Sequence, residues 1–261
     1  MMSSYIYTAL LAICLFITHP ASAADDLPQA FEAAYTLHRK GIKIAKMKRS
    51  FSHLQNGKFL YRSETITAGL LSLFRKDRVI EQSTWYLDEQ QIRPILYSYE
   101  HTGGKKERNV IIKFDWTAKR ITNSINGDSW QMQTRPNIMD KLLYQFAIMQ
   151  DIKAGKDPLV YTIADGGKIK TYNFEVLGEE VIHTKLGKLH TLKLERHKSN
   201  SKRKTTFWCA RDLNYLPVRV EHIAKDGSKT TAVINSLTGL TLEPVASVVD
   251  SLAFPDHSQG K

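Results

Sequence analysis

Short stretches in which apolar and polar residues alternate, separated by turn sequences, run through most of this chain. Every second residue is large and apolar between 110 and 116, and a similar alternation recurs over 205–210. A period of two places successive side chains on opposite faces of a β-strand. Asn-Gly pairs at 56–57 and 126–127 suit two-residue hairpin turns, because both central positions can adopt a positive φ. The pattern predicts an antiparallel sheet in which strands adjacent in sequence are also adjacent in space.

The predicted strand at 42–54 contains a change of phase. Its apolar residues move from even to odd positions, from Ile42 and Ile44 to Ala45 and Met47. One extra residue at this point, a β-bulge, would bend the strand. Repeated hairpins with such bends predict a mainly β fold: a single strongly curved antiparallel sheet, or a partial or closed β-barrel. Further strands are expected at 32–39, 58–67, 79–87, 95–99, 120–125, 129–134, 159–164, 168–177, 180–185, 188–196, 217–224 and 229–236.

One amphipathic helix is expected at about 138–153. Asn137 can cap its N terminus, and Gly155 followed by Pro158 can end it. A single helix beside a curved sheet most simply covers the open face of that sheet, and a shorter helix is expected at 69–75. The apolar face of the main helix is formed by residues spaced three or four apart: Leu142, Leu143, Phe146, Met149 and Ile152.

The first 23 residues have the pattern of a cleavable secretory signal. An apolar run over 6–17 is followed by a helix breaker and by Ala21-Ser22-Ala23, so cleavage is expected after Ala23. The run is shorter than the roughly 20 residues that cross a membrane, and Cys14 lies inside it, where a lipid anchor is not expected. We therefore expect a periplasmic protein that is not lipidated and has no transmembrane segment after cleavage. Its single β domain is expected at 24–240, with a partly disordered tail at 241–261.

The chain is strongly basic, with a formal net charge of +11. An exported basic protein is attracted to anionic phospholipid headgroups, lipopolysaccharide or acidic glycans, whereas nucleic acid is not expected in this compartment. Lys43, Lys46 and Lys48 alternate with apolar residues along one predicted strand. They are candidates for docking an anionic partner, although lysines on a solvated edge strand also discourage unwanted strand pairing.

No recognisable catalytic machinery is present in the sequence. There is no G-x-S-x-G element, no Walker loop, and no H-x-H or H-E-x-x-H pattern, so neither a catalytic residue, a metal site nor a cofactor is expected. Ser199 and Lys202 form an S-x-x-K pair, but they lie in a charged run expected at a hairpin tip. Cys209 lies between Trp208 and Ala210 and is expected to be a buried thiol rather than a nucleophile.

Several short blocks follow one another along the chain: Phe114-Asp115-Trp116, the segment 140–143, Asp165-Gly166-Gly167, and Phe207-Trp208 with 215–219. Their order resembles that of the exported bacterial family Domain of Unknown Function 3108, over about residues 30 to 237. The resemblance implies a single antiparallel β domain without known catalytic residues, and it assigns no functional residue. The last block is also similar to that of periplasmic lipoprotein carriers, whose half-barrels hold acyl chains under a helical lid.

Two functions are compatible with these observations. In the first, a non-enzymatic periplasmic protein binds a lipid, a lipoprotein acyl chain or another apolar envelope ligand in its curved sheet, and the helix acts as a lid. The alternative is a basic interaction or assembly factor with a packed core, which binds an anionic glycan, lipopolysaccharide or a protein through Lys43, Lys46 and Lys48. An enzyme with an unrecognised site is a third reading, and a monomer is expected in each case. If the protein binds an apolar ligand, the residues expected to line the binding site are Val110, Ile112, Phe114 and Trp116.

Overall fold

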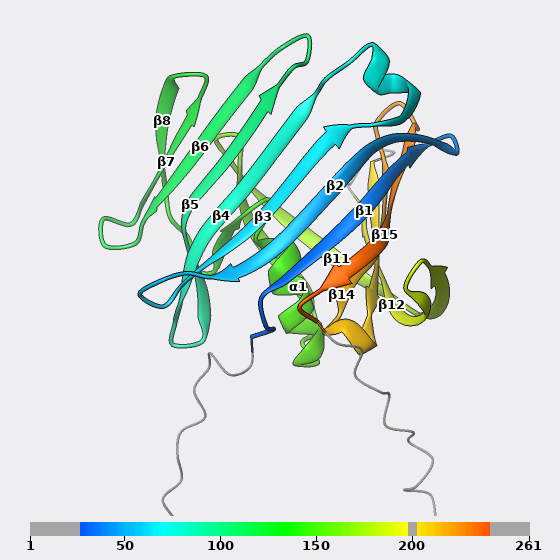
Figure 1. Ribbon diagram of the computed structural model, residues 1–261. Helices are drawn as coiled ribbons and strands as arrows, with labels where there is room; N and C mark the ends of the chain where they lie inside the picture. The colour runs from blue at the N-terminus through cyan, green and yellow to red at the C-terminus, as the bar shows by residue number, and fades with distance from the viewer. Residues whose placement is uncertain (1–26, 198–202, 241–261) are drawn as a thin grey trace, which may run out of the picture.

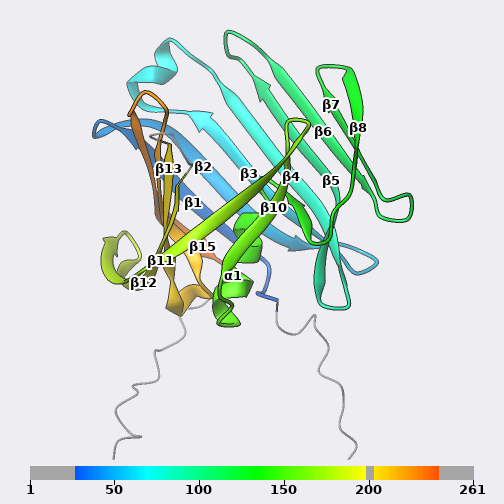
Figure 2. The same ribbon diagram turned by 180° about the vertical axis from the view of Figure 1, so that it is seen from behind.

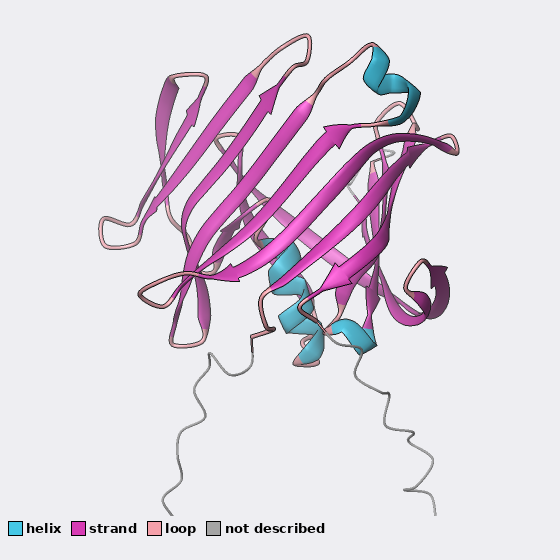
Figure 3. Cartoon of the chain, in the orientation of Figure 1, coloured by secondary structure: helices cyan, strands magenta, loops and turns pink. Residues whose placement is uncertain are grey.

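The computed structural model describes residues 27–197 and 203–240. Within these ranges all fifteen strands belong to one sheet, which curves strongly around a single α-helix (Figures 1 and 3). The two edges of the sheet are not paired with each other, so the barrel is partial rather than closed. The predicted mainly β fold is confirmed. The expected signal with its cleavage site after Ala23, the tail at 241–261, and Ser199 and Lys202 lie outside the described residues.

The first half of the sheet is an uninterrupted meander in which each strand pairs antiparallel with the next. A short 3₁₀ helix, η2 (Gly69–Leu73), connects its third and fourth strands. The strands are β1 (Phe31–Arg39), β2 (Ile42–His53), β3 (Lys58–Thr67), β4 (Arg78–Asp88), β5 (Gln91–Thr102), β6 (Arg108–Asp115), β7 (Arg120–Ile125) and β8 (Asp128–Gln133).

The second half contains the helix α1 (Tyr144–Lys153) and the remaining strands. These strands are antiparallel except for the first pair, β9 and β10, which is parallel. A 3₁₀ turn, η3 (Arg211–Leu213), precedes the penultimate strand. The strands are β9 (Ile138–Asp140), β10 (Leu159–Asp165), β11 (Lys168–Thr184), β12 (Gly187–His197), β13 (Lys204–Ala210), β14 (Leu216–Ile223) and β15 (Lys229–Thr238).

The two halves are joined by the first and last strands of the chain. β1 pairs antiparallel with β15 in the middle of the sheet, so the strand order runs from β8 through β1 and β15 to β9. In Figure 2 the hairpin of β10 and β11 crosses in front of the first meander. Its turn contacts β7 and β8: the Gly167 amide donates a hydrogen bond to Asn123 Oδ1 at 3.2 Å, and a Cβ added at Gly167 would lie 2.0 Å from Trp130 Nε1.

The predicted bulge in β2 is confirmed. Leu37 of β1 pairs with Ala45, but the next residue, His38, pairs with Lys43, which leaves Ile44 as the extra residue. The Ile44 carbonyl instead accepts a hydrogen bond of 2.9 Å from the amide of Ala68, at the start of η2. The bulge therefore bends β2 and supports the loop that follows β3.

The predicted start of the helix is wrong by six residues. Residues 138–140 form the strand β9, and α1 begins at Tyr144. Asn137 has a φ of 54° and does not act as the N-terminal cap. The side chain of Asp140 accepts hydrogen bonds from the amides of Leu142 and Leu143, so a carboxylate satisfies backbone donors just before the helix.

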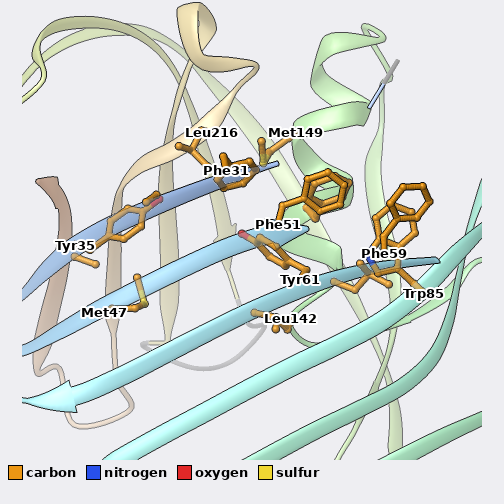
Figure 4. Packing of buried hydrophobic residues seen from close by; sticks show 14 of the residues in the cluster. Phe31, Tyr35, Met47, Phe51, Phe59, Tyr61, Trp85, Leu142, Met149 and Leu216 are labelled. Atoms are coloured by element: carbon orange, nitrogen blue, oxygen red, sulfur yellow. The ribbon is translucent and has the colours of Figure 1, made fainter. Parts of the chain in front are cut away.

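The helix lies against both halves of the concave face and is part of the core. Phe146 contacts the first meander, with its ring centroid 4.7 Å from that of Phe51 and 5.3 Å from that of Trp85. Tyr144 and Ile148 belong to a second cluster of buried residues with β10 to β13. Figure 4 shows aromatic side chains of β1 to β4 directed toward the helix that carries Met149. The apolar helix surface is therefore buried on two sides.

Candidate functional site

The third side of α1 lines a pocket, which we call the α1 pocket. Gln150 and Asp151 follow Ala147 by three and four residues, and Ala154 follows them by four and three, so the four lie on one face of the helix. They face a cavity of about 450 Å³ between α1, β9 and the tip of the β4–β5 hairpin. The other lining residues are Leu27, Leu87, Gln90, Gln91, Ile92, Asn137, Met139, Lys153 and Lys156.

The lining of the α1 pocket is divided between apolar and polar side chains. Ala147 is 2% exposed, and Leu87, Ile92 and Met139 are partly buried and pack against the core. The polar lining residues Gln90, Gln91, Lys153 and Lys156 are exposed. The pocket thus has an apolar interior and a polar rim.

A fully buried carboxylate fixes the helix relative to the sheet. Asp140 Oδ2 accepts a hydrogen bond of 2.6 Å from Ser83 Oγ of β4, and Asp140 Oδ1 accepts bonds of 2.9 and 2.8 Å from the amides of Leu142 and Leu143. Burial raises the pKa of Asp140 to about 6, although these hydrogen bonds oppose the shift by stabilising the carboxylate. The start of α1 is therefore attached to β4.

The next residue, Lys141, adds a second attachment. Its Nζ lies 2.9 Å from Glu81 Oε1, which also accepts a hydrogen bond of 2.7 Å from the Tyr97 hydroxyl. The same ammonium group lies 4.4 Å from the ring centroid of Tyr99. Burial and the nearby Glu81 carboxylate raise the pKa of Tyr97, so the hydroxyl remains a donor. Both attachments hold the helix that forms one wall of the pocket.

A cationic side chain is also buried on the concave face of β2. Arg49 is 7% exposed and lies between Met47 and Phe51 on the face that points into the core. Burial lowers the pKa of Arg49, but the nearby Tyr61, Tyr35 and Glu81 together raise it above the ordinary value, so the guanidinium stays charged. Among the described residues, Arg49 Nε and Nη1 and the Tyr61 hydroxyl make no hydrogen bond of good geometry, although Arg49 is close enough to Tyr61 to oppose the rise in the pKa of its hydroxyl.

Arg49 was not identified as an interior residue by sequence reasoning, because it belongs to a run of basic residues at 39–49. Its position two residues from both Met47 and Phe51 was the available signal, since residues i and i+2 share one face of a strand. The pocket-lining residues could not be found in this way. They come from the region before β1, the β4–β5 hairpin, β9 and α1.

The residues predicted to line an apolar ligand lie on or next to β6. Val110, Ile112 and Phe114 are buried in the core together. Trp116 is partly buried, and its Nε1 donates a hydrogen bond of 2.8 Å to the Pro94 carbonyl. None of the four lines the α1 pocket. The structure therefore places Val110, Ile112 and Phe114 together in the packed core rather than around the pocket.

The three lysines predicted to dock an anionic partner share the convex face of β2. Lys43, Lys46 and Lys48 pair with His38, Thr36 and Ala34, which alternate along β1. Lys46 and Lys48 are exposed, and Lys48 forms an ion pair of 2.7 Å with Glu32. Their role as a docking site stays a prediction.

Other candidate chemistry is also placed by the structure. Cys209 is fully buried, and burial raises the pKa of its thiol, so the reactive thiolate is disfavoured. Across residues 27–197 and 203–240, no cluster of three or more His, Cys, Asp or Glu side chains is suited to hold a metal ion. No helix in the same ranges has the length and apolar character needed to cross a membrane.

Comparison with known proteins identifies a family. The profile of DUF3108, described as a protein of unknown function, matches residues 34–234, as the sequence blocks predicted. No curated protein sequence matches the chain. A solved structure, the β-barrel-like protein of domain of unknown function DUF1849 from Brucella abortus, has a TM-score of 0.56 at 10% identity, covering 82% of this chain and 99% of that chain. This likeness concerns the fold alone.

Two further solved structures show lower similarity. A Bacteroides fragilis protein described as exported has a TM-score of 0.34 at 8% identity, covering 81% of this chain and 97% of that chain. The lipoprotein LppX of Mycobacterium tuberculosis has a TM-score of 0.23 at 13% identity, covering 85% of this chain and 91% of that chain. Neither similarity is high enough to support an argument about this chain.

Proposed function

We propose that this chain, which belongs to the DUF3108 family, is an exported, non-enzymatic protein that holds a lipid or another apolar ligand in the α1 pocket. The observation that carries the proposal is the pocket of about 450 Å³ beside a helix packed into a partial barrel. Ligand pockets usually enclose roughly 300–1,000 Å³ and combine a mainly apolar lining with a few polar groups. The volume of the α1 pocket falls within this range, and its lining combines an apolar interior with a larger share of polar side chains at the rim.

The distribution of polarity in the pocket suggests how a ligand would lie. An apolar segment would contact Leu87, Ile92, Met139 and Ala147, which are at least partly buried. A polar end would lie at the exposed rim near Lys153. A molecule with one apolar and one polar end therefore fits better than a uniformly polar one.

The charged groups around the pocket support binding rather than catalysis. Lys156 Nζ donates hydrogen bonds of 3.2 and 3.1 Å to the two carboxylate oxygens of Asp151. These lining charges are thus paired with each other at the surface rather than directed at a common reacting atom. Export is supported by the signal pattern of residues 1–23.

The proposal is tested with two tryptophan substitutions in α1. Gln150 and Gln145 are both partly buried glutamines of the helix, but only Gln150 lines the pocket. Binding of a fluorescent fatty acid is measured by titration for the wild type, Gln150→Trp and Gln145→Trp. We expect Gln150→Trp to weaken binding by at least about tenfold, equivalent to about 1.4 kcal/mol, because the indole occupies ligand space. Gln145→Trp should bind like the wild type.

Two results would contradict the proposal. The first is a wild-type protein that binds no fluorescent fatty acid and that carries no ligand in native mass spectrometry after purification from its own envelope. The second is an equal effect of both substitutions, because binding would then depend on the helix in general rather than on the pocket. Circular dichroism of each variant verifies that the sheet has formed.

A further inference from the structure

The loop between β3 and β4 exposes large apolar side chains. Leu70 and Leu73 are each 75% exposed and Phe74 is 84% exposed; we call these three residues the η2 patch. Ile42 and Ile66, at the adjoining ends of β2 and β3, are also exposed. Single exposed apolar residues are common, but a contiguous group of large ones marks a surface that contacts something apolar.

The η2 patch is displayed on an ordered loop. The Thr67 amide donates a hydrogen bond of 3.0 Å to the Asp77 carbonyl, which closes the base of the loop. Gly69 has a φ of +71°, and a Cβ at this position would lie 2.6 Å from the Lys43 carbonyl oxygen. Glycine is therefore required where the loop packs against β2, and the side chains that follow it are held outside the core.

The only acidic side chain in the loop is neutralised locally. Arg75 donates two hydrogen bonds of 2.8 Å to the carboxylate of Asp77, and His101 Nε2 lies 2.9 Å from the same carboxylate. These partners hold the pKa of Asp77 below its usual range. The surface around the η2 patch consequently carries no unpaired carboxylate from this loop.

Exposed lysines lie in this loop and in two turns at the same end of the sheet. The β3–β4 loop touches the β5–β6 turn, since the Lys76 carbonyl would lie 2.2 Å from a Cβ on Gly103. The β1–β2 turn lies at the same end, away from α1 (Figure 1). Four exposed lysines in these three loops form no ion pair with another residue in the described part of the chain. We call these lysines the basic rim: Lys40, Lys76, Lys105 and Lys106.

We infer that this end of the protein docks on an anionic lipid bilayer, with the η2 patch inserted at the headgroup boundary and the basic rim on the lipid phosphates. Apolar side chains surrounded by lysines have the composition of interfacial membrane anchors. Each basic residue near an anionic surface adds to the attraction. A second copy of the chain is less suitable as the occupant, because two basic rims would face each other.

Docking in this way would direct one end of the partial barrel toward the bilayer. Along β1 the concave side chains change from fully buried at Ala33 to half-buried at Leu37 and exposed at Arg39. The concave face is thus less covered at the end that carries the η2 patch, whereas α1 fills the other end (Figure 2). A membrane bound here would lie across the less covered end.

The inference is tested by flotation of the full chain with lipid vesicles. The vesicles contain phosphatidylcholine alone or phosphatidylcholine mixed with phosphatidylglycerol. We expect the wild type to float with the mixed vesicles only. The triple variant Leu70→Ser, Leu73→Ser and Phe74→Ser should bind at least about tenfold more weakly, since partial burial of three such side chains exceeds 1.4 kcal/mol.

A control variant removes three exposed apolar residues on other strands. Val160, Leu177 and Val181 lie on β10 and β11 and are 44%, 44% and 49% exposed, and their triple serine variant should float like the wild type. Replacement of the basic rim by glutamine should remove the preference for phosphatidylglycerol. Failure of the wild type to float, or equal binding by the two triple variants, overturns the inference. A third result would also overturn it: the wild type forms a dimer, the η2 triple variant is the only variant that dissociates this dimer, and that variant floats with the vesicles as the wild type does.

Discussion

The buried carboxylate of Asp140 predicts an unusual dependence of stability on pH. Its pKa is about 6 in the folded protein, compared with an ordinary value of 3.8. The folded state therefore holds the Asp140 proton more tightly than the unfolded state does. Asp140 contributes fully to stability below about pH 3, where it is protonated in both states, and this contribution is lost as the pH rises from there through about 6.

The size of the effect follows from the shift in pKa. A difference of about two units, at about 1.4 kcal/mol per unit, corresponds to about 3 kcal/mol in all, of which about 2.5 kcal/mol falls between pH 4 and pH 7. Asparagine at this position keeps an oxygen that can accept from the amides of Leu142 and Leu143, and an amide that can donate to Ser83. The substitution Asp140→Asn thus retains the local contacts and removes the titration.

The assay is urea unfolding of the wild type and of Asp140→Asn at several pH values from about 4 to about 7. We expect the free energy of unfolding of the variant, relative to the wild type, to rise by about 2.5 kcal/mol over this range. Comparison with the variant at each pH cancels the opposite contributions of Glu64, Asp77 and Glu180, whose pKa values are lowered. A difference that stays constant, or that falls as the pH rises, would refute the reasoning.

Three further predictions concern the interior and can be measured by the same unfolding experiments. Arg49→Met should leave the protein as stable as the wild type or up to about 2 kcal/mol more stable, because it removes buried Nε and Nη1 donors that make no hydrogen bond of good geometry; a measurable loss of stability would contradict this. Phe146→Ala should cost about 3–5 kcal/mol, since this fully buried ring contacts Phe51 and Trp85. Gly167→Ala should detach the β10–β11 turn from Trp130 and redshift its fluorescence, and an unchanged spectrum and stability would show that the turn adjusts without cost.

Local sequence patterns predicted most of the strands, because alternation and Asn-Gly turns depend on residues close in sequence. They missed β9 and divided β11, which is one strand, into two at 168–177 and 180–185. The phase change between Ile44 and Ala45 even located the bulge in β2. The start of the helix could not be predicted equally well. Residues 138–143 have helical spacing, but pairing of Ile138 with Thr162 of β10 holds the first part as a strand.

The α1 pocket and the η2 patch depend on contacts between segments that are distant in sequence. They could therefore not be predicted from local sequence patterns. Val110, Ile112 and Phe114 were correctly placed on one face, but the alternation does not say whether that face is packed or open. The α1 pocket requires the β4–β5 hairpin to lie beside the helix. Leu70, Leu73 and Phe74 resemble a buried segment in sequence, and only the folded chain shows that they are exposed.

The pairing of β1 with β15 has a consequence for biogenesis. Thr36 and Asn235, which are joined by a side-chain hydrogen bond, are 199 residues apart in sequence. A chain that emerges from its N terminus can pair β1 with β2 early, but the other edge of β1 has no partner until the last strand arrives. Contacts this distant in sequence slow folding, and an unpaired strand edge can recruit another chain. Truncation within β15 should therefore produce a protein that aggregates through β1, even though every residue of the α1 pocket is still present.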